Sequence, residues 1–173
     1  MGQKHISLWK SAMVYGFYLA VALILASVIF YATGNIFTKA NQYVSYLIMI
    51  LGIVLVQINY RKSIGGAMPY GQALGIAVVT MVLAGVIAAV YTYLLYEIID
   101  PGLKEQLRIY TEEQMMEKGM PEAQLETAIA ITRKFQKPVV MAISAIFSYA
   151  VIGLVVGLIT SIFTKKGSIA TEG

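Results

Sequence analysis

The chain has 173 residues, of which 58% are hydrophobic and only 13% are charged, whereas about 25% are charged in a typical soluble domain. The formal net charge of +4 favours cationic anchors beside anionic lipid headgroups over nucleic-acid binding. Cysteine is absent, which excludes disulfides, thiolate metal sites and a cysteine nucleophile. The composition therefore predicts a single membrane domain.

Four long apolar runs follow one another along the chain. An α-helix rises about 1.5 Å per residue, so most of these runs can cross a hydrocarbon layer about 30 Å thick. In chain order, the predicted spans are residues 12–33, 43–60, 72–97 and 138–164. The first run is longer than the apolar part of a signal peptide, so we expect it to be retained. We predict an all-α integral membrane protein built as a bundle of four transmembrane helices.

The cations between the spans predict the orientation. If the N-terminus lies inside, six cations flank the spans on the cytoplasmic side: Lys4, Lys10, Arg61, Lys62, Lys165 and Lys166. The other short loop, residues 34–42, contains only Lys39. Short cytoplasmic loops are enriched in Lys and Arg, so we predict that both termini are cytoplasmic.

Small residues on two spans predict where helices approach each other closely. Gly71 and Gly75 open the third span, and Gly153 and Gly157 have the same four-residue spacing in the fourth. Helices in lipid associate through such small-residue faces. We favour packing inside one four-helix bundle, and a homo-oligomer is the alternative.

The chemistry of the chain changes at residues 100–136, between spans three and four, where charge is dense. Asp100 followed by Pro101 is typical of a helix start, and Gly119 is typical of a helix end. We therefore predict a helical insert outside the membrane. It is a solvated cap on the bundle, a docking element for a partner protein, or a hairpin lying flat on the membrane.

Four residues are candidate contacts for a partner. Leu125 and Ile129 are one helical turn apart on the apolar face of the second insert helix. Glu97 and Asp100 lie where span three leaves the membrane. They read either as a solvated helix end or as a site for a cation or a basic partner. On the first insert helix, Leu103, Leu107 and Tyr110 lie on one side, whereas Ile109, Met116 and Met120 lie on another.

The sequence has few features of an enzyme or a transporter. The single histidine is His5, and phosphate-binding loops, nucleotide fingerprints and metalloprotease motifs are all missing. The spans contain only mildly polar residues at mid-membrane depth, where transport sites usually hold ionisable ones. Tyr149 falls in the middle of span four, where its hydroxyl needs a partner. We predict no catalytic residue, no cofactor and no metal.

Several short motifs lie along the chain: Tyr60-Arg61, Tyr70-Gly71-Gln72-Ala73-Leu74, Ile99-Asp100-Pro101, Gly119 within a Glu-rich insert, and Phe135 to Pro138. On these motifs, the chain resembles an uncharacterised bacterial family of small four-span membrane proteins, known only as a domain of unknown function. The resemblance runs from about residue 10 to 165. It implies an inner-membrane location, the same architecture and a periplasmic insert. It implies no activity.

Two functions follow as expectations. The first is a non-enzymatic accessory or scaffold subunit of the bacterial inner membrane, which contacts a partner through its outer insert. The alternative is a small transporter or channel, either as a monomer or as an oligomer with its pore between protomers. Lipid is the expected environment in both cases, with no nucleic-acid partner.

Overall fold

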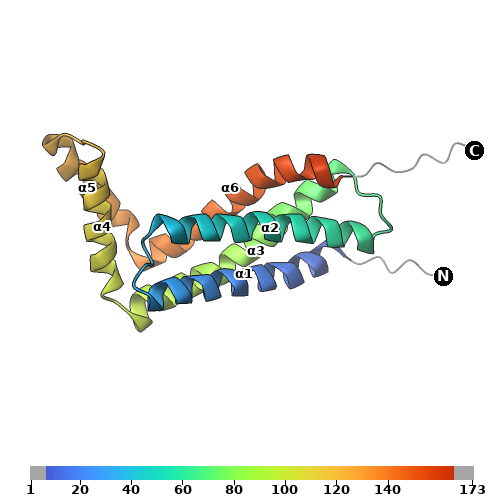
Figure 1. Ribbon diagram of the computed structural model, residues 1–173, viewed down its shortest axis with the longest axis horizontal. Coiled ribbons are helices and arrows are strands. Elements are labelled where there is room, and N and C mark those ends of the chain that lie inside the picture. Colours follow the sequence, from blue (N-terminus) through green and yellow to red (C-terminus); the bar gives the residue numbers. More distant parts are fainter. Residues whose placement is uncertain (1–6, 166–173) are drawn as a thin grey trace, which may run out of the picture.

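The computed structural model describes residues 7–165; for residues 122 and 123 it describes the backbone alone. Four long helices form an elongated bundle, and two shorter helices lie at one end of it (Figure 1). The long helices are α1 (Leu8–Ala32), α2 (Lys39–Ser63), α3 (Tyr70–Leu94) and α6 (Pro138–Thr164). The shorter helices are α4 (Leu103–Glu117) and α5 (Glu122–Phe135). We call their end of the bundle the insert end, and the end where α1 begins and α6 finishes the terminal end.

Four helices in the described part of the chain are long and apolar enough to cross a membrane. Their bounds are Leu8–Ala32, Lys39–Ser63, Tyr70–Ile99 and Pro138–Thr164. The prediction of an all-helical chain with four such helices is confirmed. Helix α2 is longer than the predicted span 43–60, because backbone hydrogen bonding continues past the apolar run. The Thr38 side chain caps it by accepting from the Asn41 backbone N–H.

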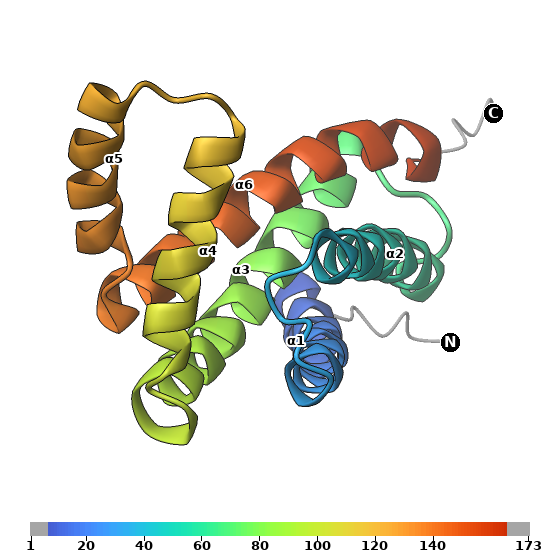
Figure 2. The same cartoon turned by 60° about the vertical axis from the view of Figure 1, so that its left-hand side comes forward.

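Helix α3 is the central element, and α1, α2 and α6 all pack against it. The middle of the bundle is filled by a cluster of buried apolar side chains that includes Leu23, Met49, Ile53 and Met81. Figure 2 shows α1 and α2 nearly end-on, while α3 and α6 run across the view. Helix α6 is therefore strongly inclined to α2.

Helix α3 ends in a short π-helical turn, Leu95–Ile99, that the sequence did not predict. The Asp100 N–H donates to Leu95 O at 2.8 Å, which is a bond to the fifth residue back. Beyond this turn, α4 runs across the insert end of the bundle, and α5 returns beside it (Figures 1 and 2). Gly119, with φ of +72°, forms part of the link between them. The two helices occupy the predicted insert.

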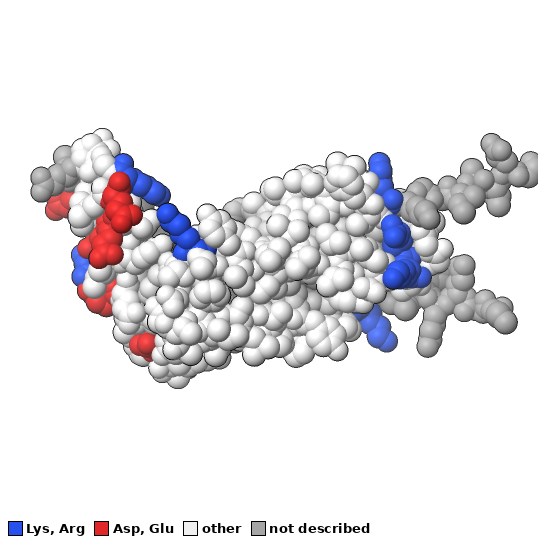
Figure 3. Space-filling model, in the orientation of Figure 1, with Lys and Arg blue, Asp and Glu red and all other residues white. Residues whose placement is uncertain are grey.

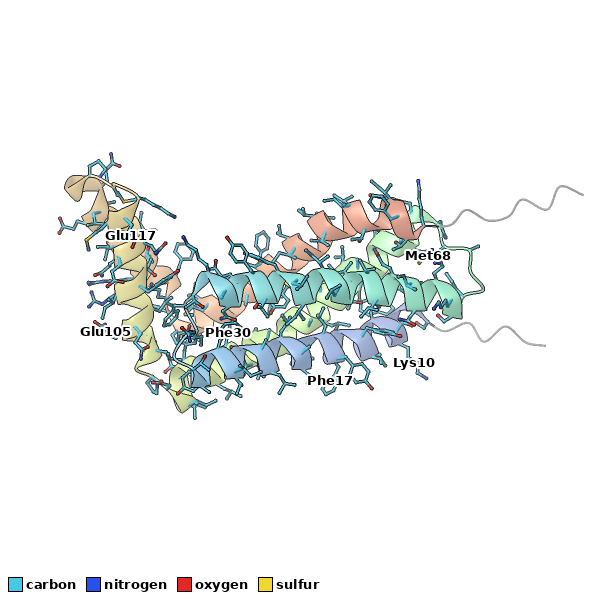
Figure 4. All side chains as sticks on the ribbon, in the orientation of Figure 1. Lys10, Phe17, Phe30, Met68, Glu105 and Glu117 are labelled. Carbon is cyan, nitrogen blue, oxygen red and sulfur yellow. The ribbon has the colours of Figure 1, made fainter. Side chains whose placement is uncertain are left out.

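Charge is confined to the two ends of the described molecule. Figure 3 shows an uncharged surface along the bundle, with Lys and Arg gathered at the terminal end. At the insert end, acidic and basic side chains both appear on the hairpin of α4 and α5. Large apolar side chains such as Phe17, Leu51 and Phe147 are exposed along the bundle (Figure 4 labels Phe17). The bundle surface therefore suits an apolar solvent.

Candidate functional site

An apolar cluster fixes the start of α4 on the insert end of the bundle. Leu103 is only 2% exposed and packs with Leu95 and Tyr96, which belong to the π-helical turn. Phe37, in the link between α1 and α2, stacks on Tyr110 with ring centroids 5.7 Å apart. Helix α4 is thus held at its first turn and again two turns later.

Two polar contacts reinforce this attachment. The Tyr31 hydroxyl donates to Asp100 Oδ2 at 3.1 Å, and Asp100 Oδ1 accepts from the Gly102 N–H at 3.0 Å. Lys104 Nζ and Glu97 Oε2 form an ion pair at 3.1 Å. Glu97 and Asp100, predicted as partner contacts, therefore make bonds within the chain that tie the insert to α1 and α3.

The other two predicted contact residues lie on α5. Ile129 lines the narrow crevice between α5 and α4, where the Gln136 amide donates to Thr111 Oγ1 at 3.1 Å. Leu125 is half-buried. The structure thus does not gather the four predicted residues on one surface. Glu97 and Asp100 lie at the start of α4, whereas Ile129 lies beside its second half.

Helix α4 has a third face that touches neither the bundle nor α5. Leu103, Leu107 and Tyr110 point to the bundle side, and Thr111 and Met115 line the crevice with α5. The remaining face is exposed and alternates acidic with apolar side chains. Its members are Glu105, Ile109, Glu113, Met116 and Glu117, and we call it the free face of α4. The sequence signal for it was the separate side on which Ile109 and Met116 fall.

Ion pairs along α4 set the charge of this face. Arg108 lies between Glu105 and Glu112 and bonds to both, in i,i+3 and i,i+4 geometry. The hydrogen bond from Arg108 lowers the pKa of the Glu105 carboxyl. Glu113 and Glu117 take part in none of the ion pairs among the described residues, so the end of the free face near Gly119 is the more acidic.

A buried polar cluster joins three helices near the terminal end. The Gln57 amide, which is 0% exposed, donates to Ala73 O and to Ser161 Oγ, both at 3.0 Å. Gln57 Oε1 accepts from the Thr164 hydroxyl at 3.1 Å. Arg61 donates to Thr164 O at 2.9 Å. This cluster secures α2 to α3 and α6, and the sequence alone gave no sign of it beyond one amide in an apolar span.

The predicted packing glycines fall into two groups. A Cβ on Gly153 would lie 2.7 Å from Met81 Cβ, and one on Gly157 would lie 3.0 Å from Ala77 Cβ. These two glycines therefore permit close contact between α6 and α3 of the same chain. By contrast, Gly71 has open space around it, and the nearest neighbour of Gly75 would be Leu8 at 3.8 Å. Close packing is thus observed at only one of the two pairs.

Within residues 7–165, no group of three His, Cys, Asp or Glu side chains is placed to hold a metal ion. His5, Lys4 and Lys166, which entered the sequence predictions, lie outside the described residues.

Comparison with curated proteins and with solved structures gave no match. The model of the family described as "Protein of unknown function (DUF4199)" matches residues 14–166. The match includes most of α1 and all of the later helices, insert included. The chain therefore belongs to this family of unknown function, in agreement with the resemblance seen in its sequence.

Proposed function

We propose that the four long helices span a bacterial inner membrane, with the terminal end in the cytoplasm and the insert end in the periplasm. The apolar bundle surface supports this, because its large exposed side chains suit lipid. The terminal end carries Lys10, Arg61, Lys62 and Lys165, in keeping with the enrichment of cations in short cytoplasmic loops.

The orientation can be tested by cysteine labelling, since the chain has no cysteine of its own. A membrane-impermeant maleimide should label Glu113→Cys in cells with a permeabilised outer membrane. Lys62→Cys should be labelled only after the inner membrane is opened. Labelling of Lys62→Cys first would reverse the proposed topology.

Within this membrane setting, the chain acts as a non-enzymatic accessory subunit that presents the free face of α4 to a partner protein. The observation that carries this proposal is that α4 is fixed along one side while its opposite side stays exposed. Ile109 is 45% exposed and Met116 57% exposed, with Glu113 between them. An acidic face with apolar side chains is complementary to a basic surface with apolar pockets.

Crosslinking in living cells tests this function. A photoreactive residue at Ile109 or Met116 should capture one defined protein, because both side chains are exposed on the free face. The matched control is Phe147, which is 71% exposed on the bundle and should yield lipid adducts. Only lipid adducts or self-adducts at Ile109 and Met116 would overturn the proposal.

Charge reversal gives a second, independent test. The double substitution Glu113→Lys and Glu117→Lys should abolish capture from Ile109, because it places two cations against a basic partner. Glu126→Lys is the control, since Glu126 is an exposed acid that belongs to α5 and not to the free face of α4. Equal loss of capture in the control would show that general charge, and not this face, controls binding.

A further inference from the structure

A polar cavity of about 150 Å³ lies in the half of the bundle nearer the insert end. All four long helices contribute to its wall. Six of its lining residues carry a hydroxyl or an amide: Ser27, Asn41, Ser45, Tyr91, Thr92 and Tyr149. Uncharged hydrogen-bonding groups from four helices therefore converge at one place in an otherwise apolar bundle.

The packing of α6 explains why space remains there. At the terminal end, Gln57 bonds α2 to α6, and beyond this point the inclination of α6 carries the two helices apart (Figure 2). Helix α6 stays close to α3, where Gly85 leaves room for Tyr149. A Cβ on Gly85 would lie 2.8 Å from Tyr149 Cβ. The cavity ends against Leu23, which belongs to the buried apolar cluster in the middle of the bundle.

The wall offers both acceptors and donors of hydrogen bonds. Asn41 Nδ2 donates to Ile36 O at 2.7 Å, which leaves the buried Asn41 Oδ1 without a partner among the described residues. The Tyr91 hydroxyl donates to Ser27 Oγ at 3.3 Å, so the Ser27 proton is available to another acceptor. A buried amide oxygen in an apolar medium is costly unless a donor reaches it. Asn41 Oδ1 is covered by its neighbours, so the groups of the wall that can meet a ligand are hydroxyls, which both donate and accept. The site therefore suits a ligand that carries hydroxyls of its own.

The charge and the depth of the cavity further limit the chemical class of the ligand. Its wall includes no Asp, Glu, Lys, Arg or His, which disfavours phosphates, carboxylates and amines. Asn41 lies in the first turn of α2, whereas Tyr149 lies about three turns into α6. The cavity thus extends inward from the membrane boundary, the level at which the glycerol backbone of a lipid lies.

We propose that this cavity binds a neutral polyhydroxyl group of glycerol size, whose hydroxyls bond to those of Ser27 and Tyr149, with Asn41 beside them in the wall. Leu23, Ile24 and Ala88 line the remaining wall and pack against the C–H atoms of the ligand. The group belongs either to free glycerol or to diacylglycerol, which share this chemistry.

Two probes distinguish the sources, with the full chain in phosphatidylcholine nanodiscs. Native mass spectrometry reports retained dioleoylglycerol, and saturation-transfer NMR reports free glycerol. Binding of either probe supports the site and identifies the source. Retention of neither probe would mean that the cavity holds only water, which overturns the proposal.

Substitutions in the cavity wall test whether a bound probe lies in the cavity. Asn41→Leu should lower the affinity for the probe at least tenfold. Asn59→Leu should bind the probe like the wild type, because the Asn59 amide donates only to Leu55 O of its own helix. Tyr149→Phe removes one hydroxyl and keeps the ring against Gly85, so it carries the test if Asn41→Leu fails to fold. Unchanged binding in Tyr149→Phe and in a folded Asn41→Leu would place the ligand elsewhere and overturn the proposal.

Discussion

Gln57 of α2 and Ser161 of α6 share a hydrogen bond of 3.0 Å across 104 positions of sequence. The Gln57 amide also donates to Ala73 O of α3 and accepts from the Thr164 hydroxyl of α6. One buried side chain therefore links three helices. In an apolar bundle, such a bond specifies which helices meet as well as contributing stability.

Replacement of this amide should destabilise the bundle. Gln57→Leu keeps the size of the side chain but removes three hydrogen bonds, so we expect a loss of about 1 to 2 kcal/mol in unfolding free energy. Titration with a denaturing detergent in bicelles measures it. Asn59→Leu, on the same helix, should change stability little. Equal stability of Gln57→Leu and the wild type would contradict the assigned role.

The contact between α3 and α6 should be sensitive to added volume. Gly153→Ala places a methyl group 2.7 Å from Met81 Cβ, so we expect a cost of about 1 to 3 kcal/mol from overpacking. Gly71→Ala has free space and should be neutral or slightly stabilising, because alanine favours a helix more than glycine does. Detergent denaturation of both variants checks the contrast. A larger cost at Gly71 would contradict this packing.

The anchoring of α4 can be tested at Leu103. Leu103→Ala removes a side chain that is 2% exposed, and we expect a loss of about 2 to 5 kcal/mol at this junction. Hydrogen exchange should rise across Leu103–Glu117 and stay unchanged in the middle of α2. Ile109→Ala, on the free face, is the control and should leave exchange unaltered. Unchanged exchange in Leu103→Ala would show that α4 is held by other contacts.

The pairing of Arg108 with Glu105 predicts a local pH dependence. The pKa of Glu105 is lowered in the folded state, so its stabilising contribution is complete above the ordinary value of about 4.3. That contribution is lost as pH falls through the lowered pKa, because the carboxyl then becomes neutral. An NMR titration of the Glu105 carboxyl carbon should show a midpoint below the ordinary value.

Arg108→Met should return the Glu105 midpoint to the ordinary range. A Glu105 midpoint that does not move would mean that the ion pair is absent in solution.

The sequence was most informative about the long helices, because hydropathy runs depend only on local composition. It also located both insert helices through Pro101 and Gly119. It could not reveal the cavity, whose wall combines Ser27, Asn41 and Tyr149 from three separate spans. The one local signal was Tyr149, whose hydroxyl was expected to need a polar partner at mid-span.

The same reasoning explains the mixed result for the glycines. A four-residue spacing identifies a smooth strip on a helix, but not which neighbour lies against it. Gly153 and Gly157 face α3, whereas Gly71 lies in the first turn of α3, at the terminal end of the bundle. Which of the two glycine pairs packs closely against a neighbour depends on the inclination of α6. That inclination depends on contacts between residues far apart in sequence.

The π-helical turn at Leu95–Ile99 carries a last consequence. A π-turn accommodates one more residue than an α-turn, and each α-helical residue rotates the chain by about 100°. Removing one residue from this turn would restore a regular spiral and swing Asp100 away from Tyr31. The direction in which the insert leaves the bundle is therefore set by a single extra residue, because that residue changes the helical rotation at which α3 ends.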